Sequence, residues 1–336
     1  MIQMLKIDFH LPEVAFVTEE VVLTFPLMRF ALRFRADAAF WAVGYRGSAW
    51  RGVFGHALKR LVCIWREGDC KRCLVAKNCV YPYVFETPMV RTNELREELS
   101  PHPFVLDVDG DWGRRQLVEE TVGVTLFGEG CRNWPYVLQA LREGGAMGIG
   151  REKIRMELCE ICQEDTPGSG RWVSVWDETS GMTVMEGKLP LPPTATTLFR
   201  IRLETPLRLR LQQRMVTASE LQPAQFLEAV ERRVAILGKL HGSPRLAGES
   251  VGSGEERRAG RWVERVREIK RDLRWRDWER YSNRQRGKVP MGGVVGEWIW
   301  EAGADWEGWP HLWLGQWLHA GKGTSMGLGR YRVDPL

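Results

Sequence analysis

A five-residue pattern, M-G-[IL]-G-R, occurs twice in this chain, at Met147 and again at Met326. Each copy leads into a short segment with the composition of a strand. No helical pattern follows either copy, and the Walker pattern G-x-x-x-x-G-K-[ST] is absent, so the glycines do not fit the known phosphate-binding motifs. The repeat instead predicts that one structural unit is present twice.

A chain of 336 residues is long for one compact domain and comfortable for two. The stretch KLPLPPT, residues 188–194, is rich in proline and therefore stiff. We take it as the domain boundary, with one domain at residues 1–188 and the other at 195–336.

The hydrophobic periodicity of the first half changes along the chain in a regular way. It predicts, in order, a strand at 30–40, a helix at 48–65, strands at 103–108 and 121–127, a helix at 133–145 and a strand at 151–158. This is the split β-α-β-β-α-β order of a ferredoxin-like domain. A hairpin is expected to fill residues 160–185.

The second half repeats this order. We expect a strand at 197–207, a helix from Ser219 and a long loop at 241–256. A basic helical stretch follows, in which Trp262, Val266, Ile269 and Leu273 have the spacing of a core-facing stripe. The fold class predicted for the whole chain is α+β, with tandem ferredoxin-like domains.

Composition and charge narrow the functional classes. The chain has 44% apolar and 27% charged residues, without a run of 18 apolar residues or an N-terminal signal pattern, so a soluble, cytoplasmic protein is expected. The formal charge is only +5, yet residues 261–288 hold eleven Lys or Arg against five Asp or Glu. Aromatic residues are interleaved there, as in RNA-binding surfaces. Backbone contacts are expected from Arg280, Arg284 and Arg286.

Four of the seven cysteines lie within seventeen residues, with the spacing Cys63-x6-Cys70-x2-Cys73-x5-Cys79. The segment is too polar and short to bury a core, and four thiolates around a metal ion are the usual remedy. Zinc in a structural role is the first choice. The spacing is also compatible with an iron-sulfur cluster or with unligated thiols.

Four segments carry a resemblance to a known family: YRGSAWRGVFGHAL, CVYPYVFET, DWERYSNRQRGKVPMGGVVGEW and WLHAGKGTSMGLGRY. With these, the chain resembles the RAMP superfamily of CRISPR-associated proteins, which serve antiviral defense, and within it the endoribonucleases that cut precursor CRISPR RNA. The resemblance implies RAMP (RRM-like) domains that bind CRISPR repeat RNA. It also implies cleavage without a catalytic metal ion, leaving 2′,3′-cyclic phosphate and 5′-hydroxyl ends. A non-catalytic RAMP subunit that binds guide RNA in an effector complex is the alternative.

Cleavage by the 2′-hydroxyl of RNA needs a base, an acid and a cation for the charge that grows on the phosphate. His56 shares a helix face with Gly52, Lys59 and Arg60, where small residues leave room for a ribose-phosphate. Related enzymes place a tyrosine before such a histidine and a lysine after it, and Tyr45 and Lys59 fill that order. We expect His56 to act as general base or acid, with Tyr45 and Lys59 as its catalytic partners. Arg60 is expected to contact the RNA. The alternative is that His56 only contacts RNA or packs at a helix edge. His319 is a second candidate.

The C-terminal loop can now be interpreted. Glycines let backbone N–H groups approach a phosphodiester closely, and basic side chains add charge. We expect RNA contacts from Gly321, Lys322, Gly323, Gly327, Gly329, Arg330 and Arg332. The alternative is that these glycines only form tight turns. Expected partners besides RNA are the subunits of an effector complex or a second copy of the chain, and no membrane.

Overall fold

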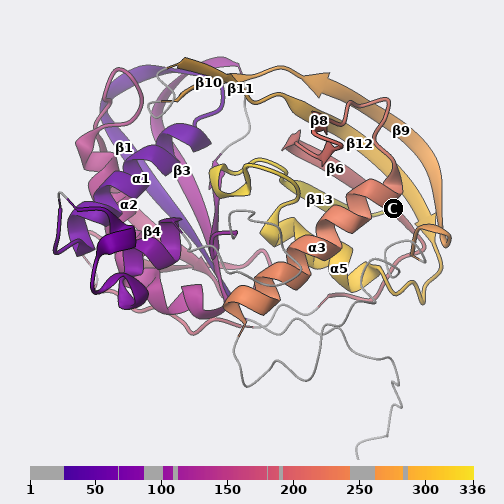
Figure 1. The fold of residues 1–336 in the computed structure, drawn as a ribbon, viewed down its shortest axis with the longest axis horizontal. Coiled ribbons are helices and arrows are strands. Elements are labelled where there is room, and N and C mark those ends of the chain that lie inside the picture. Colours follow the sequence, from indigo (N-terminus) through magenta and orange to yellow (C-terminus); the bar gives the residue numbers. More distant parts are fainter. Residues whose placement is uncertain are drawn as a thin grey trace, which may run out of the picture.

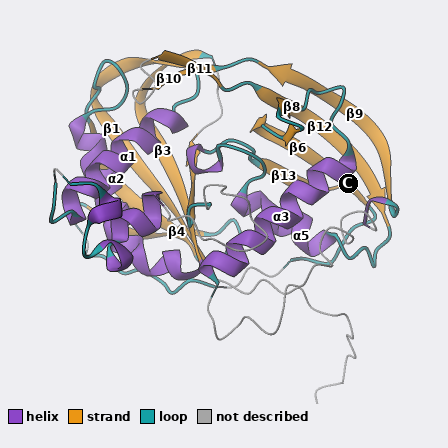
Figure 2. Ribbon diagram, viewed as in Figure 1, coloured by secondary structure: helices purple, strands orange, loops and turns teal. Residues whose placement is uncertain are grey.

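The computed structural model describes residues 26–66, 68–86, 101–108, 113–179, 181–188, 192–242, 262–282 and 287–336. Two α+β halves lie side by side, and in each half the helices cover one face of an antiparallel sheet (Figures 1 and 2). No helix in these ranges is long and apolar enough to cross a membrane.

The first half contains a five-stranded sheet in the order β2-β3-β1-β4-β5. Its elements are β1 (Leu27–Val43), α1 (Gly47–Val62), the short turns η1 (Cys70–Arg72), η2 (Ala76–Asn78) and η3 (Pro82–Glu86), β2 (Phe104–Val108), β3 (Arg114–Phe127), η4 (Gly128–Asn133), α2 (Trp134–Met147), β4 (Met156–Glu164) and β5 (Trp172–Asp177). The first four strands and two helices form the predicted β-α-β-β-α-β unit, and β5 extends its sheet.

The second half contains a four-stranded sheet in the order β13-β6-β12-β9. Its elements are β6 (Leu198–Leu207), the small hairpin β7 (Arg210–Leu211) and β8 (Arg214–Met215), α3 (Pro223–His241), β9 (Val266–Arg276), β10 (Glu279–Ser282), β11 (Gly287–Pro290), β12 (Gly293–Ala302), α5 (Trp309–Leu318), η5 (Thr324–Met326) and β13 (Tyr331–Pro335). Within each unit the fourth strand pairs with the first, the first with the third and the third with the second. The tandem ferredoxin-like fold is therefore confirmed.

The helical stripes expected in both halves are buried. Trp50, Phe54 and Leu58 of α1 are inaccessible to solvent, and their spacing places them on the face that covers the first sheet. Helix α3 buries Phe226 and Val230 in the same way. Periodicity at 3.6 residues thus identified α1 and α3, one of the helices that pack on each sheet.

The prediction of a helix across residues 262–273 is wrong beyond its first residues. Residues 266–276 form strand β9, which pairs with β12 at the edge of the second sheet. Trp262 is buried, but Ile269 is 46% exposed. The helical spacing of a few apolar residues was outweighed by the pairing available along the aromatic strand β12, because strand formation depends on the neighbouring strand more than on local propensity.

The two halves exchange core residues. The hairpin β10–β11 leaves the second sheet and reaches over the first half (Figure 1). There Met291 joins the first core, and Trp278 packs edge-on against Tyr45 with ring centroids 5.6 Å apart. In return, Val105 and Phe127 belong to the second core.

Candidate nucleic-acid interface and active site

Helix α1 is fixed by a buried ion pair at its beginning. The Arg46 guanidinium donates to the Glu120 carboxylate of β3 at 2.7 Å, and the Trp50 indole N–H donates to the same carboxylate at 2.8 Å. A Cβ at Gly47 would lie 2.0 Å from the carbonyl oxygen of Met326. The first turn of α1 therefore lies directly against the C-terminal glycine loop, which Figure 1 shows between the two halves.

The C-terminal loop has glycine where a side chain would not fit. Gly327 has φ +88°, and a Cβ there would lie 1.9 Å from the Tyr45 hydroxyl oxygen. Gly329 has φ +72°, and a Cβ would lie 1.8 Å from the Ala320 carbonyl oxygen. Packing and turn geometry thus account for these two glycines without RNA. Contact of the loop with RNA remains a prediction.

The first M-G-I-G-R copy serves as a tight turn. Its backbone closes through hydrogen bonds in both directions between Ile149 and Ile154, 2.8 and 3.1 Å long. A Cβ at Gly148 would lie 2.5 Å from the Lys153 carbonyl oxygen. This copy joins α2 to β4.

Arg51 links α1 to the C-terminal loop. Its Nε donates to the Ser325 hydroxyl at 2.9 Å, and a terminal nitrogen lies 3.1 Å from Nε2 of His102. The guanidinium also lies over the Phe85 ring, 4.3 Å from its centroid. Burial, and then the neighbouring Arg280, lower the Arg51 pKa to about 10. Within the described residues, no carboxylate pairs with this cation.

Three further cations are linked to Arg51 one after another, through Arg280, then Arg208, then Lys322. Burial lowers the Arg208 pKa, and Arg210 and Arg280 lower it further. Arg280 on β10 thus acts on both Arg51 and Arg208, and its buried Nε has no hydrogen-bond partner among the described residues. The backbone N–H of Lys322 donates to the Arg208 carbonyl at 2.9 Å, and the Lys322 side chain is exposed. We call Arg51, Arg208, Arg280 and Lys322 the cationic junction. Within the described residues none of the four cations is paired with a carboxylate, and a group of unpaired cations attracts anions.

His56 is exposed in the middle of α1, about 8 Å along the helix axis from Arg51. A Cβ added at Gly52, one turn earlier on the same face, would meet nothing within 4 Å. Lys59 is half-buried, with Nζ 5.6 Å from the Tyr81 ring centroid. Arg60 is exposed and donates to the Met147 sulfur at 3.5 Å. The structure thus brings His56, Lys59 and open space together on one helix.

Tyr45 is not part of that exposed group. It precedes α1, is 5% exposed and lies under Gly327 and Trp278. Burial raises its pKa well above the usual value. Its contacts give Tyr45 a position at the junction of the two halves.

The remaining predicted RNA contacts differ in accessibility. Arg330 is largely buried. It pairs with Asp107 of β2, and its Nε lies 2.8 Å from the carboxylate of Glu204 on β6. Arg332 keeps 48% of its side chain exposed, 3.4 Å from Glu204. Arg284 and Arg286 lie outside the described residues.

Two further histidines lie in less accessible places, His102 half-buried and His319 buried. His102 stacks between Phe85 and Phe104 beside Arg51, and burial lowers its pKa to about 3. His319, the second catalytic candidate, is 2% exposed at the end of α5, and burial lowers its pKa to about 3 as well. Both are neutral at physiological pH, and His319 has no exposed face for a substrate. Phe104 is two residues from His102, but Phe85 comes from a separate segment, so local spacing did not indicate the stack.

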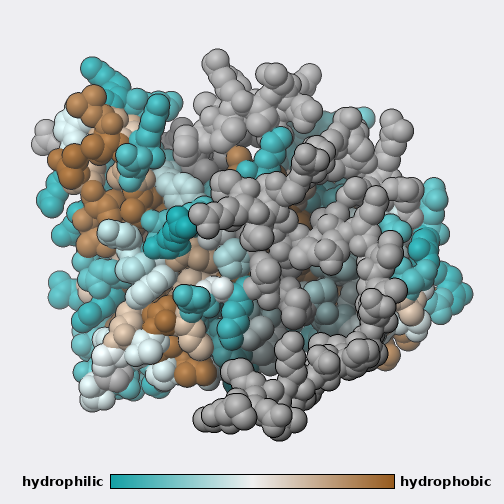
Figure 3. Space-filling view, turned by 90° about the horizontal axis from the view of Figure 1, so that it is seen from below, coloured by the Kyte–Doolittle hydropathy of each residue, from teal (hydrophilic) through white to brown (hydrophobic). Residues whose placement is uncertain are grey.

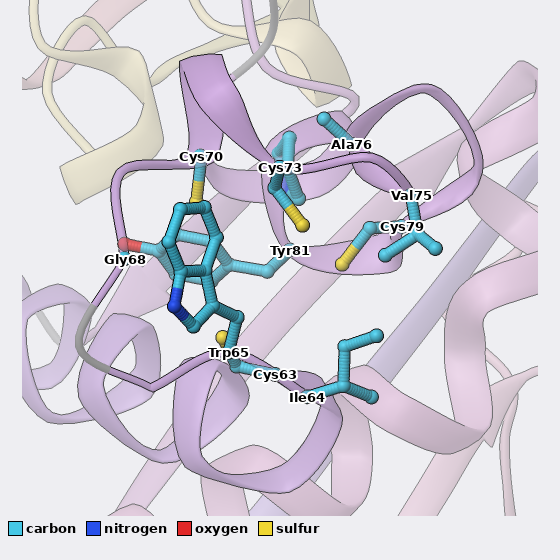
Figure 4. A pocket seen from close by; sticks show the side chains of 11 residues that line it. Cys63, Ile64, Trp65, Gly68, Cys70, Cys73, Val75, Ala76, Cys79 and Tyr81 are labelled. Atoms are coloured by element: carbon cyan, nitrogen blue, oxygen red, sulfur yellow. The ribbon is translucent and has the colours of Figure 1, made fainter.

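The four clustered cysteines line a single pocket, together with Trp65 and Tyr81 (Figure 4). All four thiols are free. As they stand, no three His, Cys, Asp or Glu side chains within the described residues are arranged so that they could hold a metal ion. The zinc site therefore remains a prediction, and the four cysteines proposed as its ligands line the same pocket.

Comparisons with known proteins agree with this architecture. Residues 201–331 match the family model of the CRISPR-associated endoribonuclease Cas6, and residues 25–189 match a family model described as an N-terminal domain. An uncharacterized protein of Archaeoglobus fulgidus is 24% identical over 146 residues, 43% of this chain and 44% of that protein. The alignment thus spans less than half of this relative.

Solved structures match nearly the whole chain. A Cas6 product complex is similar over 92% of this chain and 99% of that chain, with 17% identity and a TM-score of 0.51. Thermus thermophilus Cas6 matches over the same shares, with 14% identity and a TM-score of 0.51. A partial Cas6-RT-Cas1–Cas2 complex matches over 94% of this chain and 47% of that chain, with 12% identity and a TM-score of 0.56. These matches confirm the expected fold. The resemblance to CRISPR-associated endoribonucleases is confirmed by the Cas6 family model over residues 201–331.

Proposed function

We propose that this chain is an endoribonuclease that processes precursor CRISPR RNA, binding repeat RNA across the two halves and cutting it through its own 2′-hydroxyl. The observation that carries the proposal is the cationic junction. Arg51 of the first half is linked through Arg280 to Arg208 and Lys322 of the second at the glycine loop, and no carboxylate among the described residues pairs with any of them. A phosphodiester backbone is the anion that such a line of cations fits.

The RNA backbone would pass from this junction along the exposed face of α1. The absence of side-chain atoms around Gly52 gives a ribose room to approach His56. Phosphate contacts by guanidinium groups would set the position of the strand, and they carry no base specificity. Selection of the repeat then depends on contacts to its bases.

In the reaction, a 2′-oxygen attacks the adjacent phosphorus and the bond from phosphorus to the 5′-oxygen breaks. The 2′-proton passes to a base, and the departing 5′-oxygen receives a proton from an acid. The products are a 2′,3′-cyclic phosphate and a 5′-hydroxyl. His56 is assigned one of the two proton transfers, and Lys59 stabilises the charge on the phosphate oxygens. Tyr45 positions the glycine loop against α1 and makes no proton transfer.

A second candidate function is a non-catalytic subunit that holds guide RNA. The burial of Tyr45 favours it, because the tyrosine expected beside a catalytic histidine does not reach the exposed face of α1. This function would use the same cationic junction without cleavage.

The experiment that separates the two uses RNA carrying the cognate repeat and a copy deoxygenated at the 2′ position of the cut site. Both are incubated with purified protein in the presence of a chelator. The proposal expects cleavage of the first RNA alone, with a cyclic phosphate end. Tight binding without cleavage of either RNA would support the guide-holding subunit.

A further inference from the structure

Residues 63–79 form a segment with very little to hold it in place. Within its described part no residue is buried, and Leu74 and Ile64 are 101% and 79% exposed. Its regular structure is limited to the short turns η1 and η2. Seen from below, the first half of the molecule carries several apolar areas on its surface (Figure 3). A segment that exposes apolar side chains and buries none needs a cross-link to keep one conformation.

The inner side of this segment carries four cysteine thiols, which line one pocket with apolar side chains. Cys63 follows α1, Cys70 begins η1, Cys73 follows η1 and Cys79 follows η2. The four cysteines thus line the pocket from four points of the chain. In the close-up, the sulfur atoms of Cys73 and Cys79 point into the space beside Trp65 (Figure 4). Ligands that surround a small space from separate turns are what a tetrahedral ion requires.

We propose that Cys63, Cys70, Cys73 and Cys79 bind one zinc ion as four thiolates, in a structural site that ties the end of α1 to the segment before η3. The spacing Cys70-x2-Cys73 matches that of zinc-binding turns, in which two thiolates from one turn share an ion. Ligation draws the four sulfur atoms inward from their present positions, and each thiol gives up its proton on binding.

The charge around the pocket suits this site. Zinc with four thiolates carries a net charge of −2, and the segment supplies basic side chains. Lys71 and Arg72 lie in η1 and Lys77 in η2, while Lys59 lies over the ring of Tyr81, which lines the pocket. These cations offset the negative charge of the complex.

The zinc site would also help to hold Arg51 of the cationic junction in position, through two aromatic rings. Tyr81 stacks on Phe85 with ring centroids 5.7 Å apart, and Phe85 in turn lies under the Arg51 guanidinium. A Cβ at Gly55 of α1 would lie 2.2 Å from the Phe85 ring, so this ring fits closely between helix and arginine. The zinc proposal itself stands on the pocket and does not depend on the RNA-processing function.

The first test is the metal content and thiol count of the full chain purified anaerobically. The expected result is about one zinc per chain without acid-labile sulfide, because a four-thiolate site holds zinc tightly at neutral pH. Alkylation before and after chelation, mapped by mass spectrometry, should show these four cysteines protected only before. This measurement needs no variant and no nuclease activity.

The second test uses a matched pair of double variants. Cys70→Ser with Cys73→Ser removes two proposed ligands, and Cys159→Ser with Cys162→Ser removes a pair of equal spacing on strand β4. The first variant should lose zinc and melt at a lower temperature, and the second should keep both properties. Cobalt added to the chelated wild-type chain should give the thiolate charge-transfer absorption of a tetrahedral site.

Several results would overturn the proposal. These are free reactivity of all four clustered thiols without zinc in the native chain, two disulfides among the four cysteines, iron with acid-labile sulfide, or equal zinc loss in both double variants. If the ligand variant fails to fold, the protection of wild-type thiols still decides the matter.

Discussion

Arg51 on the first helix donates from Nε to the hydroxyl of Ser325 in the C-terminal loop, 2.9 Å away, and so joins segments 274 residues apart in the chain. The contact brings a cation from the first half close to Arg280 of the second, which also acts on Arg208. Neither half has this junction by itself.

Replacement of Arg51 by alanine should weaken repeat RNA binding about tenfold, as expected for a charged hydrogen bond to phosphate. The slope of log affinity against log salt should fall by about 0.7, the value for one phosphate contact on a single strand. Fluorescence anisotropy at several salt concentrations measures both quantities. Arg132→Ala is the control, because Arg132 is 80% exposed and paired with Glu129. Equal affinities of the two variants would contradict the role of Arg51.

Replacement of His56 by alanine should slow cleavage by about 10²- to 10⁴-fold, the usual contribution of a general acid or base. RNA affinity should change little, because the proton transfer adds nothing to ground-state binding. Single-turnover cleavage with excess protein separates the two effects. Leu61→Ala, at the exposed end of the same helix, should cleave like wild type. Wild-type rates in the His56 variant would remove it from the mechanism.

Two glycine-to-alanine changes should have opposite effects on folding. Gly327→Ala places a Cβ 1.9 Å from the Tyr45 hydroxyl at φ +88°, and should lower the free energy of unfolding by at least about 1–3 kcal/mol. Gly52→Ala lies inside α1 with no atom within 4 Å, and should raise it by about 0.5–1 kcal/mol. Urea unfolding gives both values.

The Gly52 variant also tests the RNA path. The added methyl group should slow cleavage although the protein is more stable, since it narrows the approach to His56. A stabilised variant with unchanged cleavage would exclude an RNA path over Gly52.

Acid should destabilise the fold through His102. Its pKa falls from the ordinary 6.5 to about 3 on folding, so the unfolded chain binds more protons between these values. The free energy of unfolding therefore decreases as pH falls through this window, by up to about 1.4 kcal/mol per pH unit for this group. His102→Gln keeps an acceptor for Arg51 and should reduce the slope by that amount. Urea titrations at pH 7, 6 and 5 compare the two chains, and an identical slope would refute this source of acid sensitivity.

The order of helices and strands could be predicted from the sequence, because most helices have one apolar stripe and the strands alternate apolar and polar residues. Helix α5 lacked such a signal: it is buried on nearly all sides, so its tryptophans and leucines follow no 3.6-residue pattern. Strand β9 was taken for a helix because its pairing partner could not be inferred from local spacing. The exposed place of His56 beside Gly52 could be predicted, because these two residues are neighbours on one helix. The cationic junction could not be predicted, because Arg51, Arg208 and Arg280 meet only through the docking of the two halves.

The exchange of core residues between the halves sets how the protein denatures. A chain cut near residue 190 would leave Trp278 and Met291 without the first core, and would leave Val105 and Phe127 of the first fragment without the second. Each fragment would expose the apolar surface that the other half covers in the intact chain, and such surfaces promote aggregation. The intact chain is therefore expected to melt in one cooperative step, and its two repeats, although copies of one fold, to be inseparable as folding units.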